Sequence, residues 1–269
     1  MQTAVHTVAA FYKFVTLDDC PLLRERLHAE ATRLKIKGTV LLAAEGINGT
    51  LAGSAGSIAE FLQLLRRDPR LRDLEHKEAF ANSAPFARLK VRIKREIVTL
   101  GRPEADPNRQ VGAYVEPRDW NRLIQDPDVL LLDTRNAYEY AIGSFAGAVD
   151  PGTRQFREFP DFVARTLGAD RDRPIATFCT GGIRCEKATA FLLAQGFTRV
   201  YHLKGGILKY LEEIAPGESL WRGECFVFDE RVAVGHGLRP GAARLCPQCG
   251  WAIGDDADCP QCRSVAAAG

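Results

Sequence analysis

The chain has 269 residues and a formal net charge of +2 at neutral pH. This length predicts roughly two domains of about 150 residues each, and the balanced charge gives no global attraction to nucleic acid or membrane. Because we find neither an apolar run of the roughly 20 residues that span a bilayer nor a signal-peptide pattern at the start, we expect a cytoplasmic protein with no membrane partner. In that compartment the eight cysteines are expected to serve catalysis or metal binding rather than disulfides.

The first hundred residues alternate between strand and helix patterns. We expect strands at residues 5–14, 38–44 and 50–52, a strand or strand pair at residues 88–100, and helices at residues 21–34 and 57–67. The order strand, helix, strand, strand, helix, strand is the split βαβ pattern of a ferredoxin-like α+β domain. We therefore place a ferredoxin-like domain at residues 1–100.

Basic and apolar residues alternate in the last predicted strand of this domain. The apolar set, expected to face the core, is Leu89, Val91 and Ile93. The basic set on the other face is Arg88, Lys90, Arg92 and Lys94. Such a stripe can bind the phosphates of RNA, and the release of counterions drives this binding. The alternative is that the stripe is simply the solvated outer face of the strand. Pattern alone leaves both interpretations open, and we single out Lys90 and Arg92 as candidate RNA contacts.

The rest of the chain divides into three segments. Residues 101–117 are polar and contain prolines, so we expect a linker there. Strands and helices alternate through residues 118–219, which predicts a parallel α/β domain whose ligand crevice lies beyond the carboxyl ends of its strands. Residues 220–269 form a small cysteine-rich C-terminal segment. Its aromatic residues and Cys225 are expected to be buried rather than to stack on bases.

A loop between a predicted strand and a predicted helix carries the chemistry of the α/β domain. Cys179 ends the buried strand, two glycines follow, and Arg184 opens the helix. The N–H groups of such a loop and the positive end of the helix stabilise an anion at the centre, so we expect a Cys179 thiolate with a lowered pKa. We predict Cys179 and Arg184 as catalytic residues, since a merely buried cysteine would not require this spacing. The residues predicted to contact substrate are Thr180, Gly181, Gly182 and Ile183.

The pattern of Cys179 and Arg184 separated by four residues resembles the active-site loop of rhodanese domains, which handle sulfur. The related phosphatase loop is one residue longer. Further segments follow in the order of a rhodanese domain: Asp133-Thr-Arg135, Glu139, Gly143-Ser-Phe-Ala-Gly-Ala148 and Leu203-Lys-Gly-Gly-Ile207. The central domain is therefore expected to be rhodanese-like.

Six motifs in order extend the resemblance over nearly the whole chain. They are Glu45-Gly-Ile-Asn-Gly-Thr50, Lys90-Val-Arg92, Glu96-Ile-Val-Thr-Leu-Gly101, Asp133-Thr-Arg-Asn136, Cys179-Thr-Gly-Gly-Ile-Arg-Cys-Glu-Lys187 and Gly223-Glu-Cys-Phe-Val-Phe-Asp-Glu-Arg231. Together they resemble the oxygen-dependent tRNA uridine hydroxylase family. The resemblance implies a tRNA-modifying oxidoreductase that hydroxylates the wobble uridine at C5, with tRNA as partner and molecular oxygen as co-substrate. It also implies an essential Cys179, with or without a persulfide, and a Lys187 that orients the loop or contacts substrate.

Two other functions compete with this interpretation. The loop taken alone favours a sulfurtransferase that moves sulfane sulfur through a Cys179 persulfide, with a sulfur-donor protein as partner. A non-catalytic RNA-binding module is the third hypothesis, although it would not need the cysteine. We find no glycine fingerprint for a flavin or nicotinamide, and no clear iron site among the five histidines. Cys185 is a candidate for resolving a persulfide or sulfenate on Cys179, but a packing role is favoured.

Four cysteines near the C-terminus have the spacing of a metal site. Cys246-Pro-Gln-Cys249 and Cys259-Pro-Gln-Cys262 are separated by nine residues. Two such pairs supply four soft ligands for tetrahedral zinc, and four protein ligands leave no open position. We therefore predict a structural zinc held by these cysteines; disulfides are disfavoured in a cytoplasmic protein.

Overall fold

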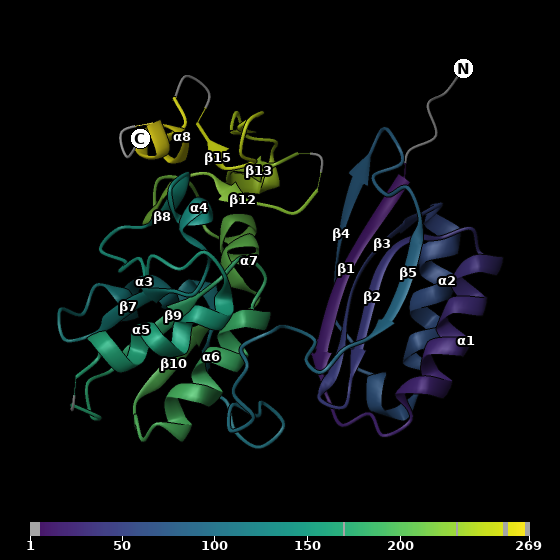
Figure 1. Cartoon of the computed structure of the whole chain (residues 1–269), viewed down its shortest axis with the longest axis horizontal. Coiled ribbons are helices and arrows are strands. Elements are labelled where there is room, and N and C mark those ends of the chain that lie inside the picture. The colour runs from purple at the N-terminus through teal and green to yellow at the C-terminus, as the bar shows by residue number, and fades with distance from the viewer. Residues whose placement is uncertain (1–5, 169, 230, 255–257, 267–269) are drawn as a thin grey trace. The chain divides into compact units, whose positions relative to one another are not determined.

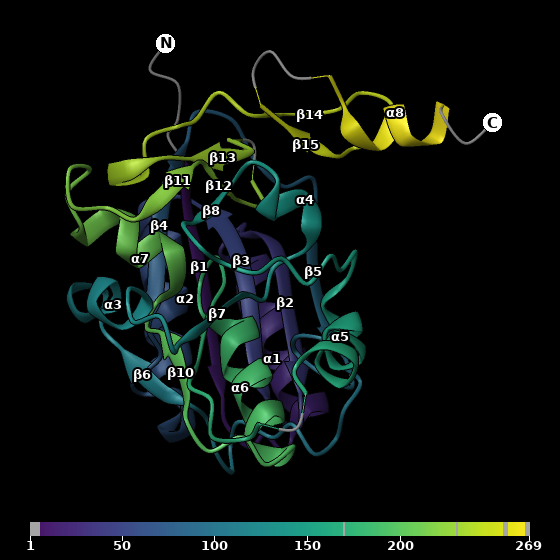
Figure 2. The same cartoon turned by 90° about the vertical axis from the view of Figure 1, so that its left-hand side faces the viewer.

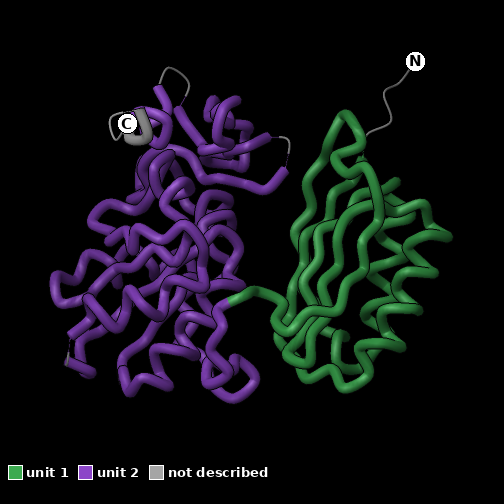
Figure 3. Tube along the Cα trace, in the orientation of Figure 1, with its two compact units in different colours: residues 1–99 green, residues 100–269 purple. Residues whose placement is uncertain are grey.

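The computed structural model describes residues 6–168, 170–229, 231–254 and 258–266. The chain divides into two compact units, residues 1–99 and residues 100–269 (Figure 3). Each unit has its own sheet and its own core, so each is described by itself. The cysteine-rich C-terminal segment belongs to the second unit.

The first unit is a five-stranded sheet with two helices (Figure 1). Its elements are β1 (His6–Phe14), α1 (Cys20–Arg33), β2 (Lys37–Ala43), β3 (Gly46–Gly53), α2 (Ala55–Arg66), η1 (Pro69–Leu71), β4 (His76–Ala81) and β5 (Leu89–Ile93). The strand order is β4-β1-β3-β2-β5, and the first four of these strands pair antiparallel with one another. This is the predicted ferredoxin-like arrangement with one strand added at the edge.

The fourth strand of that arrangement differs from the predicted one. It is β4, a polar edge strand whose residues are at most half-buried and which therefore lacks an apolar signal in the sequence. The predicted strand at residues 88–100 is reduced to β5, which pairs parallel with β2 at the opposite edge of the sheet. Within the predicted strand or strand pair, only Leu89–Ile93 forms a strand, and the strand His76–Ala81 was not predicted.

The core of the first unit lies between the sheet and the two helices. Helix α1 buries Leu23, Leu27 and Ala31 at a spacing of four residues, so they lie on one face. On β5, Val91 joins this core, whereas Ile93 is 45% exposed. The expectation that Ile93 faces the core was wrong: Ile93 is the last residue of β5, and its side chain is exposed.

The second unit is built on a four-stranded parallel sheet in the order β6-β10-β9-β7. Its elements are β6 (Ala113–Val115), α3 (Pro117–Ile124), β7 (Leu130–Asp133), α4 (Ala137–Tyr140), β8 (Gly143–Phe145), η2 (Phe156–Glu158), α5 (Phe159–Thr166), β9 (Ile175–Phe178), α6 (Ile183–Ala194), β10 (Val200–Leu203) and α7 (Gly206–Glu213). Helices α3 and α7 pack on one face of the sheet, and α5 and α6 lie on the other (Figure 2). The predicted parallel α/β fold is confirmed. Strand β6 lies within the segment expected to be a linker.

The C-terminal segment consists of small two-stranded sheets. Its elements are β11 (Trp221–Gly223), β12 (Cys225–Phe226), β13 (Ala233–Val234), η3 (His236–Leu238), β14 (Arg244–Leu245), β15 (Ala252–Ile253) and α8 (Pro260–Ala266). Strand β11 pairs with β8, and Trp221 packs edge-on against Phe145 in the core of the second unit. Cys225 is buried as expected, but Phe228 is 66% exposed. Within the described residues, no helix is long and apolar enough to cross a membrane.

Candidate active site

Two strand ends bring the candidate site together. Because β7 and β9 are parallel neighbours, Asp133 and Phe178 end at the same edge of the sheet, and Cys179 follows directly. The N–H and the hydroxyl of Thr134 both donate to the carbonyl oxygen of Phe178, at 3.0 Å each. The first residues after the two strands are thereby fixed to one another.

Backbone hydrogen bonds from the start of α7 fix the position of the cysteine loop. The N–H of Ile207 donates to the carbonyl oxygen of Cys179 at 3.0 Å, and the N–H of Leu208 donates to that of Thr180 at 3.1 Å. Since these carbonyls are bonded outward, the loop can turn an N–H inward, and Gly182 N donates to Cys179 Sγ at 3.1 Å. Gly182 has a φ of +105°, which favours glycine at this position.

Cys179 lies at the centre of this loop and is fully buried. Burial by itself raises the pKa of its thiol, but a hydrogen bond with Cys185 and the positive charge of Arg184 act in the opposite direction. Together with backbone N–H groups they lower the pKa to about 6. Cys179 is therefore a thiolate at neutral pH, the form in which a cysteine acts as a nucleophile.

Arg184 owes its position to a carboxylate from another helix. Its two terminal nitrogens bind the two oxygens of Glu139 at 2.6 and 2.7 Å, and both side chains are buried. Burial raises the pKa of Glu139, but Arg184 lowers it further, so the pair stays ionised. Glu139 belongs to α4, where it also accepts from the N–H of Asn136 at 3.1 Å. Glu139 is not among the predicted site residues; a local signal for it in the sequence is its capping-box spacing from Asn136.

A second buried ion pair supports the same edge of the sheet. Arg135 Nη2 binds Asp133 Oδ2 at 2.6 Å, and both side chains are fully buried. The same nitrogen donates to the carbonyl oxygen of Gly143, and Ser144 Oγ donates to Asp133. Since its oxygens are bonded to Arg135 and Ser144, we assign Asp133 to the scaffold of the site rather than to its chemistry.

The residues predicted to contact substrate differ in exposure. Gly181 and Ile183 are half-buried, whereas Thr180 and Gly182 are buried. Lys187 is fully buried in α6, so in this conformation it reaches no solvent. Lys90 and Arg92 belong to β5 of the first unit. On that strand Lys90 is half-buried and Arg92 is exposed, and the role of all these residues in binding stays a prediction.

The four C-terminal cysteines lie together. Their sulfur atoms are all within 4.8 Å of one another. The separation is 3.8 Å between Cys246 and Cys262, and 3.4 Å between Cys249 and Cys259. Zinc bound tetrahedrally at about 2.3 Å requires sulfur atoms roughly 3.8 Å apart, so the arrangement fits a metal held by four thiolates. The N–H of Cys246 donates to the carbonyl oxygen of Trp251 at 2.8 Å, which closes the first knuckle.

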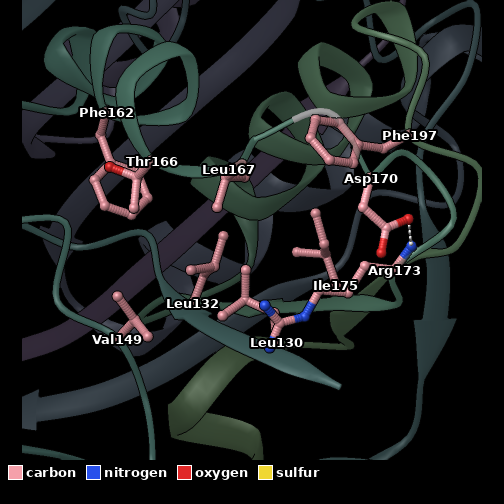
Figure 4. A pocket seen from close by; sticks show the side chains of 10 residues that line it. All are labelled: Leu130, Leu132, Val149, Phe162, Thr166, Leu167, Asp170, Arg173, Ile175 and Phe197. Carbon is pink, nitrogen blue, oxygen red and sulfur yellow. Dashed lines mark hydrogen bonds between the residues drawn. The ribbon is translucent and has the colours of Figure 1, made fainter. Parts of the chain in front are cut away.

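A pocket of about 140 Å³ lies elsewhere in the second unit (Figure 4). Leu130 and Ile175, the first residues of β7 and β9, line it together with Phe162 and Phe197. It therefore opens near the amino ends of the strands, whereas Cys179 follows a carboxyl end. Its lining is mostly apolar and contains none of the predicted site residues, so we do not include it in the candidate site.

Comparisons with known proteins cover almost the whole chain. Residues 6–97 match the UPF0176 acylphosphatase like domain, and residues 116–213 match the rhodanese-like domain. Three tRNA uridine(34) hydroxylases are similar to the chain. The one from Picosynechococcus is 57% identical over 91% of this chain and 83% of its own length. The proteins of Agrobacterium fabrum and Albidiferax ferrireducens are 59% and 55% identical over 90% and 96% of this chain, and 77% and 85% of their own lengths.

Among solved structures, a rhodanese-like domain from Anabaena is also similar. It shares 21% identity with the chain and has a TM-score of 0.34. The alignment covers 41% of this chain and 78% of the Anabaena domain.

Proposed function

Because this chain belongs to the tRNA uridine(34) hydroxylase family, we propose that it hydroxylates uridine 34 of tRNA at carbon C5 with molecular oxygen as co-substrate. The observation that carries this proposal is identity of 55–59% to hydroxylases along 90% or more of the chain. Both units lie within the matched length, so the proposal concerns the whole chain rather than its rhodanese-like domain alone.

In this proposal Cys179 is the reactive residue. A lowered pKa, a surrounding loop of N–H groups and a permanent charge on Arg184 support a reactive anionic sulfur, whether a thiolate or a persulfide. Arg184 stabilises that anion, and Glu139 holds Arg184 in place through two hydrogen bonds. The half-buried residues Gly181 and Ile183 are the part of the loop that offers surface to a nucleotide.

We propose that β5 of the first unit contributes to the binding of tRNA. Lys90 and Arg92 alternate with core residues on that strand, so they point away from the helices. Arg92 is exposed and therefore able to meet a phosphate. Lys187 is fully buried, which favours orienting the loop over contacting substrate directly. A tRNA substrate is also in keeping with the cytoplasmic location expected from the sequence.

We further propose that Cys246, Cys249, Cys259 and Cys262 hold a structural zinc ion. The sulfur separations fit tetrahedral coordination, and four cysteines leave no position for a substrate. The metal would tie α8 to the knuckle that precedes β15, because Cys262 lies in α8 and Cys246 in the knuckle. Its role would be to fold the end of the chain.

A sulfurtransferase is the second candidate function. The match of residues 116–213 to the rhodanese-like domain and the thiolate of Cys179 both favour it. It would take sulfur from thiosulfate or a donor protein and pass it to a thiol. Sustained turnover of thiosulfate with cyanide, without any change in tRNA, would favour this function over hydroxylation.

Mass spectrometry of tRNA nucleosides tests the proposal. The chain, its Cys179→Ala variant and a Cys20→Ala control are expressed in cells that lack such a hydroxylase; Cys20 is a buried cysteine of the first unit. We expect 5-hydroxyuridine at position 34 with the parent chain and with Cys20→Ala, in aerated cultures only. Cys179→Ala should yield none. If the parent chain yields none either while all variants are expressed in folded form, the proposal fails.

A further inference from the structure

The C-terminal segment exposes an aromatic ring where the sequence led us to expect buried ones. Phe228 is 66% exposed, whereas Phe226, two residues earlier, is buried. Every other phenylalanine of the second unit is buried. A single exposed apolar side chain does not by itself require a partner, so the inference depends on how this ring is held and on what lies beside it.

A short hairpin holds Phe228 in place. Strands β12 and β13 pair antiparallel, and the N–H of Val227 donates to the carbonyl oxygen of Val232 at 2.8 Å. Directly after Phe228, the carboxylate of Asp229 accepts from the backbone N–H of Arg231 at 3.0 Å and from its Nη2 at 2.6 Å. Because hydrogen bonds fix the backbone beside Phe228, its ring loses little further freedom when it binds a partner.

The same hairpin contains a strained residue. Val232 has a φ of +62°, a left-handed conformation that is unfavourable for a β-branched side chain. Its N–H donates to the carbonyl oxygen of Asp229 at 3.0 Å, which helps to hold it in this conformation. Strained backbone of this kind persists only where the surrounding structure enforces it, and it is concentrated at binding and catalytic sites. The strain therefore favours a functional role for this hairpin.

Aromatic contacts join Phe228 to the candidate active site. Its ring lies 5.1 Å from that of Phe226, which in turn lies 5.2 Å from the ring of Tyr138 on α4. Tyr138 precedes Glu139, the residue that holds Arg184 in place. Figures 1 and 2 both show α4, β8 and β12 gathered at one end of the second unit. One aromatic side chain thus separates the exposed ring from the helix that positions Arg184.

An exposed arginine lies at the same end of the second unit. Arg222 on β11 is exposed, and it lies opposite Ser144 in the pairing of β11 with β8. Ser144 Oγ donates to Asp133, which ends β7 beside the strand that leads to Cys179. Side chains of opposite residues project from the same face of a strand pair. An exposed aromatic ring and an exposed cation therefore accompany the cysteine loop.

We propose that Phe228 is a stacking platform for an unpaired base of the tRNA anticodon loop, beside the base that reacts at Cys179. This rests on the proposed function in taking tRNA as the substrate. Rings stacked under bases and cations bound to phosphates are the combination with which proteins hold single-stranded nucleic acid. Phe226 meets Phe228 at an interplanar angle of 84°, and such an edge-on contact covers at most one face of a ring. The other face receives the base.

A protein partner fits this hairpin less well than a nucleotide. Protein interfaces need a contiguous patch of several residues, and Phe228 is followed by the charged residues Asp229 and Arg231. A single ring face suffices for one base. Because every base has an aromatic face, Phe228 holds the loop without reading its sequence, and the selection of uridine belongs to other residues.

The test measures how the full-length, zinc-supplemented protein binds an anticodon stem–loop RNA with uridine at position 34. Fluorescence anisotropy compares the parent chain with Phe228→Ala, Phe228→Leu, Phe228→Trp and the control Phe80→Ala. Phe80 is 68% exposed on β4 of the first unit, so it matches Phe228 in kind and exposure. Phe228→Ala should weaken binding at least about fivefold, and equally at all salt concentrations, because no phosphate contact is lost.

The other variants separate stacking from apolar packing. Phe228→Leu keeps apolar area without an aromatic face and should weaken binding nearly as much as Phe228→Ala. Phe228→Trp keeps the face and should bind like the parent chain, as should Phe80→Ala. Stem–loops that lack one base of the loop, one position at a time, then locate the stacked base. Removing that base should weaken binding to the parent chain but not to Phe228→Ala.

The outcomes separate this inference from the proposed function, because binding is measured and no base is modified. Unchanged binding by a folded Phe228→Ala protein, or equal affinities of Phe228→Leu and Phe228→Trp, overturns the stacking role. Self-association that is lost in Phe228→Ala, with unchanged RNA binding, overturns it as well and assigns the ring to a contact between two copies of the chain. If the ring and one base depend on each other but 5-hydroxyuridine never forms in cells, the stacking role stands and the proposed function fails. Should the Phe228 variants not fold, equal binding of every base-deleted stem–loop to the parent chain overturns the inference.

Discussion

Arg184 brings a permanent charge into a buried part of the second unit, and Glu139 makes this arrangement stable. Each charge taken out of water costs free energy that is recovered only when the partner is present with good geometry. The bidentate contact at 2.6 and 2.7 Å meets this condition. The pair therefore fixes the charge that faces Cys179, and it joins α4 to α6 across the end of the sheet.

Glu139→Gln should destabilise the protein and inactivate it. The change leaves Arg184 buried without a negative partner, which costs about 3–5 kcal/mol of unfolding free energy. Denaturant unfolding measures this loss. Glu213→Gln is the control, because Glu213 pairs with Lys209 at the surface and should contribute less than about 0.5 kcal/mol. Equal stability of the two variants would contradict a structural role for the Glu139–Arg184 pair.

The pKa of Cys179 predicts an acid limb in the rate of hydroxylation. Its thiolate is the reactive form, and the pKa is about 6. The rate should therefore fall about tenfold per pH unit well below pH 6 and become level above about pH 7. Single-turnover formation of 5-hydroxyuridine, measured from about pH 5 to about pH 8, gives the limb. A rate that still rises above about pH 8 would show that the pKa of Cys179 is not lowered and is that of an ordinary thiol.

For single residues, the sequence predicts contacts between neighbours in the chain but not contacts between residues that are far apart in it. Cys179 and Arg184 were predictable because strand, glycines and helix follow one another within a few residues. Glu139 lies 45 residues before Arg184, and only folding brings the two together. The same holds for Thr134, whose contact with Cys185 spans 51 residues.

Among the elements, the start of α7 has a role in the site that its sequence does not reveal. Gly206 begins the helix with a φ of +66°, and an added Cβ would lie 2.5 Å from the carbonyl oxygen of Cys179. Only glycine allows the helix to approach the loop closely enough for Ile207 and Leu208 to donate to it. The glycine pair was visible in the sequence, but its contact with the cysteine loop was not.

Gly206→Ala should distort the loop around Cys179. The left-handed backbone and the clash with two carbonyl oxygens should lower the free energy of unfolding by about 2 kcal/mol and abolish hydroxylation. Gly217→Ala is the matched control, since nothing lies within 4 Å of the position of its Cβ. Thermal unfolding and nucleoside analysis of both variants check this. An active Gly206→Ala protein would mean that the loop does not depend on α7.

Strand β5 carries the prediction for tRNA binding. Replacing Lys90 and Arg92 by glutamine should weaken binding of tRNA uniformly and reduce its salt dependence by a slope of about 1.5, because two phosphate contacts are lost. Fluorescence anisotropy at several salt concentrations gives both quantities. The pair Arg26→Gln and Arg72→Gln removes the same charge from outside β5 and serves as control. If the salt dependence of tRNA binding has the same slope in both double variants, Lys90 and Arg92 do not contact phosphates and β5 is a solvated face.

Helices and strands could be predicted from the sequence where their apolar residues recur with a regular period. Helix α1 shows its buried face in the sequence, and its predicted bounds of 21–34 lie close to Cys20–Arg33. Strand β4 is half-buried, and β6 has three residues of which two are exposed, so neither shows an apolar pattern. Both are edge strands that form because a neighbouring strand offers its hydrogen bonds.

Within the second unit, the cysteine cluster is linked to the candidate active site by aromatic packing. The ring of Trp251, next to the first knuckle, lies 6.0 Å from that of Tyr138 on α4. Tyr138 also packs edge-on against Phe226 at 5.2 Å. Since Glu139 follows Tyr138, the C-terminal segment packs on the helix that positions Arg184. A metal at the cysteines would therefore help to hold α4.

Loss of the metal should disturb this packing. Cys259→Ser with Cys262→Ser should lower the zinc content from about one ion per chain to none and change the fluorescence of Trp251. Elemental analysis and fluorescence of the purified protein measure the two effects, with Cys20→Ala as control. Zinc retained in the double variant would contradict the four-cysteine site. Loss of zinc without any change in fluorescence would show that the metal does not help to hold α4.

We propose that molecular oxygen supplies the hydroxyl group that this chain places on uridine 34 of tRNA. We would grow hydroxylase-free cells that express the chain under isotopically heavy oxygen gas, and in parallel under ordinary gas in heavy water labelled at oxygen. We expect 5-hydroxyuridine at position 34 to carry the heavy isotope from the gas and none from the water, and Cys179→Ala to yield no 5-hydroxyuridine. Label that enters from water would show that molecular oxygen is not the source of the hydroxyl group and would leave Cys179 to act in a hydrolytic or sulfur-transfer reaction.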